Sequence, residues 1–181
     1  MRKWILFSMA MFLSVAVLAP AGRSQEKEKS KRPSPPASAT CSLPGGKTVT
    51  VDYSSPRVKG RKIFGELVPY GKVWRAGANE ATTFVTTADL TVGGKAVPAG
   101  SYTIFTIPEV SKWTLIISKK TGEWGDPYPG EGDDFARVEM QASKLGSAVE
   151  NFTIGFDQSG GSCTMHLDWE TTRASIAIAA K

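Results

Sequence analysis

Residues 163–170 read CTMHLDWE, and the order of apolar and polar residues in this stretch decides the fold class. Every second residue is apolar. In a β-strand, successive side chains point to opposite faces, so this stretch would have one apolar and one polar face. The alternation therefore predicts a strand that buries Cys163, Met165, Leu167 and Trp169 in the core and leaves His166 at the surface.

The same two-residue period recurs between residue 41 and the end of the chain, without any long helical period. Gly-Gly pairs and a Pro-Ala-Gly run separate the alternating stretches, as turns do. We expect an all-β domain over 41–181: a jelly-roll-like β-sandwich of about eight to nine short antiparallel strands, with a barrel as the alternative. At most one short helix is expected, near Ile63–Val68. The other predicted strands cover residues 48–53, 82–87, 101–107, 113–118, 135–142, 151–157 and 174–179.

The first 21 residues have the features of a secretory signal peptide. Arg2 and Lys3 precede an uncharged run over 4–19, and Ala19-Pro20-Ala21 supplies the small residues of a cleavage site. A retained membrane anchor is the alternative, but the run is short for a span, which needs about 20 apolar residues. We therefore expect export to the periplasm or the exterior, with no stable membrane span after cleavage.

Residues 22–40 are rich in Pro, Ser and Lys and contain almost nothing apolar, so we predict a disordered linker. This assignment changes the meaning of the net charge. The 181-residue chain carries +5, from 22 Lys+Arg against 17 Asp+Glu. Without residues 1–40, the domain has 15 residues of each sign. A neutral domain argues against nucleic acid as a partner.

The two cysteines are predicted to form a disulfide. Cys163 points into the core, and Cys41 has the same parity as the apolar positions Val49 and Val51. An oxidising compartment after export would favour a Cys41–Cys163 bond. Two free buried thiols are the alternative.

The segment 56–82 is too irregular for a strand, and it combines basic with aromatic residues. Arginine offers paired donors to a carboxylate or phosphate, and tryptophan offers a flat stacking surface. The segment could therefore line a pocket for a small polar or anionic ligand. Alternatively, it is an ordered connection whose Arg and Asn side chains satisfy backbone carbonyls and whose Glu80 pairs with an arginine. The candidate ligand-binding residues are Arg57, Arg61, Trp74, Arg75, Asn79, Glu80 and Thr82.

The loop 122–134 carries five acidic residues and no basic one. Calcium prefers such oxygen-rich chemistry, but the spacing matches no defined calcium loop. A solvated loop, or one paired with the basic segment, is the expectation. No metal site and no cofactor are predicted.

The chemistry for catalysis is sparse. His166 is the sole histidine, and no G-x-S-x-G nucleophile motif occurs. Glu80, Asp168 and Glu170 could converge as hydrolytic carboxylates. We expect a binding module for a small polar or carbohydrate-like ligand rather than an enzyme. The alternatives are a carboxylate-based hydrolase and a structural or envelope-interaction protein without a small ligand.

Four stretches occur in an order typical of a known family. They are SSPRVKGRKIFGELVPYGKVWRAGANEATTF (54–84), VGGKAVPAGSYTIFTIP (92–108), KWTLIISKKTGEWG (112–125) and LDWETT (167–172). Together they closely resemble the bacterial domain of unknown function 2911, over essentially all of 41–181. The resemblance implies an exported protein and supplies no catalytic residue. It also marks Arg61, Trp74, Arg75, Asn79 and Glu80 as site candidates, while Ser55 stands where similar sequences often have arginine.

Overall fold

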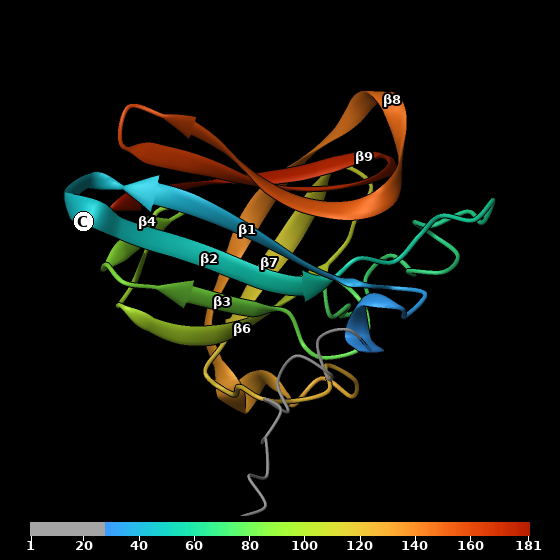
Figure 1. Cartoon of the computed structure of the whole chain (residues 1–181), viewed down its shortest axis with the longest axis horizontal. Helices are drawn as coiled ribbons and strands as arrows, with labels where there is room; N and C mark the ends of the chain where they lie inside the picture. The colour runs from blue at the N-terminus through green and yellow to red at the C-terminus, as the bar shows by residue number, and fades with distance from the viewer. Residues whose placement is uncertain (1–27) are drawn as a thin grey trace, which may run out of the picture.

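The computed structural model describes residues 28–181, and its regular structure is almost entirely β-strand (Figure 1). The all-β class is thus confirmed. The signal peptide predicted over 1–21 lies outside the described residues. The strands are β1 (Pro36–Leu43), β2 (Lys47–Ser54), β3 (Thr83–Thr86), β4 (Leu90–Val92), β5 (Lys95–Val97), β6 (Gly100–Ile107), β7 (Lys112–Ser118), β8 (Asp134–Ser159) and β9 (Ser162–Ala180). Helical structure in this part of the chain comprises the 3-10 helices η1 (Pro44–Gly46) and η2 (Glu131–Asp133) and the α-helical residues 28–30.

All nine strands belong to one sheet, in the order β1-β2-β3-β6-β7-β8-β9-β4-β5. Every pair of neighbours is antiparallel. The two-sheet sandwich stays a prediction, because hydrogen bonds connect all the strands into one sheet. Strands β8 and β9, which are 26 and 19 residues long, join β7 on one side to β4 on the other within this sheet.

The sheet is strongly curved, as the disulfide shows. Strands β1 and β9 stand six positions apart, which would separate them by about 29 Å in a flat sheet with strands about 4.8 Å apart. Yet Cys41 of β1 is bonded to Cys163 of β9, with their Cα atoms 6.4 Å apart. The predicted disulfide is confirmed. Figure 1 shows β1 lying beside the β8–β9 hairpin, so the buried face of the sheet closes on itself.

The two long strands merge stretches that the sequence predicted as separate strands. Strand β8 includes both 135–142 and 151–157, and β9 includes both 163–170 and 174–179. Their pairing is irregular between Lys144 and Thr153. Glu170, opposite this region, has a φ of 54°, a value rare outside glycine. These irregularities bend the hairpin without ending either strand.

The prediction of a short helix near Ile63–Val68 was wrong. These residues form a turn in which Phe64 and Val68 make an isolated bridge. Gly65, with a φ of 89°, adopts a backbone conformation that a helix does not contain. Ile63, Phe64 and Val68 are nevertheless buried, so the apolar residues serve packing rather than helix formation.

The linker predicted over 22–40 is also wrong in its last residues, because β1 begins at Pro36. Strand β1 lies at the edge of the sheet and pairs with β2 from Pro36↔Ser54 to Leu43↔Lys47. Proline is tolerated at the first position of an edge strand, and the outward side chains of this strand are small and polar. Residues 22–27 of the linker lie outside the described part.

The alternation in 163–170 places its residues largely as predicted. Cys163, Met165, Leu167 and Trp169 are all at most 2% exposed. They belong to a core that runs along the inner face of the sheet. Within residues 28–181, no helix has the length and apolar character needed to cross a bilayer.

Candidate functional site

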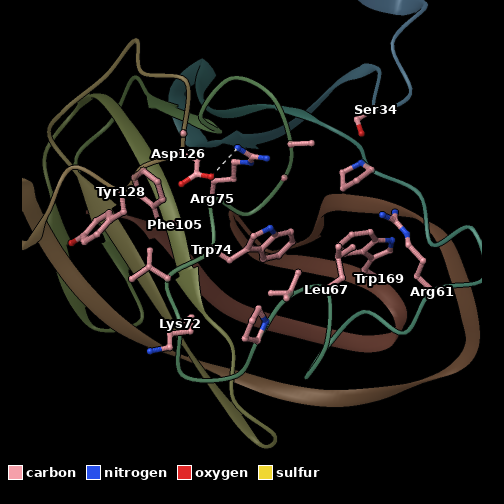
Figure 2. Close-up of a pocket in the computed structure, with 17 residues that line it drawn as sticks. Ser34, Arg61, Leu67, Lys72, Trp74, Arg75, Phe105, Asp126, Tyr128 and Trp169 are labelled. Atoms are coloured by element: carbon pink, nitrogen blue, oxygen red, sulfur yellow. Dashed lines mark ion pairs between the residues drawn. The ribbon is translucent and has the colours of Figure 1, made fainter.

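A pocket of about 420 Å³ opens at the segment 56–82, which provides most of its lining (Figure 2). The remaining lining residues are Ser34, which precedes β1, and residues of β6, the 122–134 loop and β9. Of the seven predicted site residues, Arg61, Trp74 and Arg75 line this pocket, and the other four do not. Further lining residues used below are Leu67, Pro69, Lys72, Gly125, Asp126 and Trp169.

Trp74 forms the fixed centre of the pocket wall. Its backbone exchanges hydrogen bonds with Thr106 of β6, at 2.7 and 2.8 Å. Its indole stacks on Trp169 with ring centroids 5.8 Å apart and an interplanar angle of 15°. Edge-to-face contacts with Phe64, Trp113 and Phe152 hold the ring from further sides. Such packing leaves the ring little freedom and presents it to the pocket in one orientation.

Arg75 follows directly and also faces the pocket. Its side chain is 28% exposed, and Nη1 lies 4.0 Å from Oδ2 of Asp126. Gly125 lets the loop backbone come close: a Cβ there would lie 3.1 Å from Arg75 Cδ and 3.0 Å from Ala81 Cα. Its φ of 90° also favours glycine. The 122–134 loop thus holds Asp126 beside the arginine.

Arg57 and Arg61 serve mainly to hold the backbone of the segment. Arg57 Nη1 donates to the Ser55 carbonyl at 2.8 Å and to Ser55 Oγ at 2.7 Å. Arg61 donates from Nε to the Val58 carbonyl and from Nη2 to the Arg57 carbonyl. This is the arrangement expected of an ordered connection, although Arg61 also lines the pocket.

Asn79, Glu80 and Thr82 lie outside the pocket lining. Asn79 Nδ2 donates to the Ser34 carbonyl at 3.0 Å. Glu80 binds Arg32 Nη1 at 2.8 Å and Lys29 Nζ at 3.0 Å. Thr82 is fully buried and donates to the Ala76 carbonyl. Asn79 and Glu80 therefore fasten residues 28–35, called the N-terminal segment below, to the domain.

Glu80 remains ionised to low pH. Burial alone would raise its pKa, but hydrogen bonds from its own backbone and from Arg32 and Lys29 lower the pKa to about 2. A pKa below the ordinary 4.5 means that ionised Glu80 stabilises the fold fully above pH 4.5. This stabilisation is lost as the pH falls through about 2.

Replacing Glu80 with glutamine should therefore lower the free energy of unfolding by about 1 kcal/mol or less at pH 7, because exposed ion pairs are screened by solvent. The difference from wild type should shrink between pH 4.5 and pH 2, measured by urea denaturation across that range. Glu66→Gln is the matched control, since the Glu66–Lys62 pair has side chains 62% and 63% exposed and should contribute almost nothing. A Glu80→Gln deficit that stays constant down to pH 2 would contradict this account.

Basic and aromatic side chains form ion pairs and hydrogen bonds with acidic side chains of the 122–134 loop. Arg137 pairs with Asp134 at 2.7 Å and with Glu131 at 3.1 Å, and the Tyr128 hydroxyl donates to Asp134. Burial and this hydrogen bond raise the pKa of the Tyr128 phenol. The loop meets the basic segment at the Arg75–Asp126 pair. No group of three or more metal-ligating side chains occurs within residues 28–181.

His166 was wrongly predicted to be a surface residue: its side chain is only 12% exposed. Nδ1 lies 3.2 Å from Oδ2 of Asp168, and Arg173 Nη2 lies 2.6 Å from the same oxygen. Burial alone would raise the pKa of Asp168, but its contacts with His166 and Arg173 lower it. Arg173 is three residues beyond the strand stretch that suggested the prediction, so its role could not be read from the alternation.

The three carboxylates proposed for hydrolysis have separate partners. Glu80 binds the N-terminal segment, and Asp168 binds His166 and Arg173. Glu170 Oε2 accepts a hydrogen bond from the Ile63 amide at 3.3 Å. Among the described residues that line the pocket, Asp126 alone carries a carboxylate, so none of the three proposed carboxylates lies there.

A family model described as "Protein of unknown function (DUF2911)" matches residues 34–178. The matched region includes all nine strands almost completely and the whole 56–82 segment. It begins at Ser34, which accepts the hydrogen bond from Asn79. The match confirms the resemblance drawn from the four sequence stretches. No curated protein and no solved structure matches the chain significantly.

Proposed function

This chain belongs to the DUF2911 family, and we propose that it is an exported binding module that holds a small polar ligand in the pocket beside Trp74 and Arg75. The observation that carries the proposal is the meeting of these two side chains in one open pocket. Its volume of about 420 Å³ is within the size range of small-molecule sites. Such sites combine apolar and aromatic walls with a few polar groups, as this pocket does.

Export is supported by the disulfide. Disulfides persist mainly in oxidising compartments outside the cytosol, and this one is buried and closes a sequence separation of 122 residues. The signal-peptide features of residues 1–21 point the same way. Together they favour a periplasmic or extracellular location.

The pocket favours binding over the two alternative functions. A glycosidase-type hydrolase needs two carboxyl groups across the bond to be cleaved, whereas the described pocket lining has the single carboxylate of Asp126. A purely structural role would favour a closed, salt-bridged plug. Glu80 is salt-bridged in that way, but Trp74 and Arg75 face an open pocket.

A thermal-shift screen of the purified protein against sugars, organic acids, phosphates and divalent cations tests the proposal. A ligand at 100 times its dissociation constant stabilises the fold by about 2.7 kcal/mol, which corresponds to a rise in Tm of about 5–10 °C for a domain of this size. We expect at least one class of compound to give such a shift. A broad panel without any shift would contradict the binding function.

A further inference from the structure

The hydrogen bonding of Arg75 differs from that of the other arginines of the 56–82 segment. Arg57 donates twice to oxygens of Ser55, just before the segment, and Arg61 donates twice to carbonyls within it. For the Arg75 guanidinium, the contact found among residues 28–181 is the ion pair with Asp126 at 4.0 Å. That distance is beyond hydrogen-bond range, and a guanidinium carries five N–H donors. Arg75 therefore keeps its donors available at the pocket.

The Arg75–Asp126 pair is also easy to replace. The Asp126 side chain is 76% exposed, and exposed ion pairs contribute little to stability. A ligand carboxylate or phosphate could accept two parallel hydrogen bonds from the guanidinium, which the aspartate at 4.0 Å does not. Asp126 thus lies beside Arg75 as a counter-ion, while the donors remain free for an incoming anion.

A flat apolar surface adjoins this cation. Trp169 is only 1% exposed, so the indole surface open to the pocket is mainly that of Trp74, which Trp169 backs by stacking. Leu67 and Pro69 extend the apolar wall, and Leu67 is 46% exposed. Figure 2 shows Arg75 and Asp126 on one side of Trp74 and Leu67 on another, with the Lys72 ammonium directed away from the indole.

The two features are close enough for one small molecule. Trp74 and Arg75 are consecutive, so their Cα atoms are about 3.8 Å apart. Both side chains line the same pocket. Resting on the proposed function, we infer that the ligand is a carboxylate or phosphate joined to a flat ring, with Arg75 binding the anion and Trp74 the ring.

Four probe compounds separate the two parts of this inference: benzoate, phenyl phosphate, benzamide and acetate. Isothermal titration calorimetry on the purified, oxidised protein should show binding of benzoate and phenyl phosphate. Benzamide lacks the charge and should bind about tenfold more weakly or worse, because charge-assisted hydrogen bonds to arginine are lost. Acetate lacks the ring and should bind about tenfold more weakly or worse, because stacking on Trp74 is lost.

Variants assign each part to its residue. Arg75→Gln should weaken benzoate binding about tenfold and leave benzamide binding unchanged, because the amide does not use the charge. Arg75→Lys should give an intermediate affinity for benzoate, since lysine keeps the charge without the planar fork. Leu67→Asn should weaken benzoate and benzamide alike, by about threefold. Lys95→Gln, which removes an exposed cation on β5 outside the pocket, is the control and should change nothing.

The outcomes distinguish this inference from the proposed function. Benzamide binding as tightly as benzoate, or benzoate binding unaffected by Arg75→Gln, would overturn the inference and leave the binding function in place. The same holds if none of the four probes binds but the thermal-shift screen finds a neutral ligand. If no compound in either experiment binds, both are overturned.

Discussion

Replacing Cys41 and Cys163 together with serine should lower the free energy of unfolding by about 4–5 kcal/mol, the loop-entropy value for a closed loop of this length. The bond joins residues 122 apart in sequence. It also holds β1, an edge strand, against β9 on the closing side of the sheet. Removing the bond therefore frees the unfolded chain and leaves the closure to packing and to hydrogen bonds such as that from Gln158 Nε2 to the Ser42 carbonyl at 2.8 Å.

Urea denaturation of wild type and the double serine variant measures this loss. Reductant is the control: it should destabilise wild type by a similar amount and leave the variant unchanged. A loss below about 1 kcal/mol would mean that the buried strand contacts hold the closure without help from the disulfide.

Replacing Trp169 with alanine should cost about 3–5 kcal/mol, because a large core aromatic is lost and a cavity remains. Trp169 is 1% exposed and contacts Phe64, Trp74 and Phe152. Its indole also donates to the Glu150 carbonyl at 3.3 Å. The variant should unfold at a lower urea concentration and bind benzoate more weakly, because Trp74 loses its stacked support.

Trp124→Ala is the matched control for this change. Trp124 lies in the acidic loop and is 56% exposed, so its removal should alter stability by about 0.5 kcal/mol or less. Equal losses from the two tryptophan variants would contradict the role given to the aromatic cluster.

The fold was predictable where one face of a strand is apolar. The alternation in CTMHLDWE identified a core strand and the inward direction of Cys163, and both hold in the structure. Strand β1 was missed because its outward residues are small and polar and it begins with proline, which local composition cannot tell from a linker. Residues 36–43 form a strand because they pair with β2, and the sequence of these residues alone does not reveal that partner.

The candidate site was predictable only in part, because its residues are distinguished by partners far away in the chain. Glu80 and Asn79 face Arg32 and Ser34, which are 48 and 45 residues away. The prediction treated those N-terminal residues as linker, so it could not assign Glu80 to them. Arg61 and Arg75 have the same chemistry in the sequence. Their roles differ because Arg61 has carbonyls within reach, while Arg75 lies beside Asp126 at the pocket.

Ligand binding at Trp74 and Arg75 can be observed directly by following the indole and guanidinium N–H signals in ¹H–¹⁵N NMR spectra during a titration with benzoate. We predict that the Trp74 Nε1–H and Arg75 Nε–H signals shift together and saturate at the same concentration, while the Trp124 signal stays in place. Benzoate binding that leaves the Trp74 and Arg75 signals unmoved, or that shifts Trp124 instead, would contradict the assignment of the pocket.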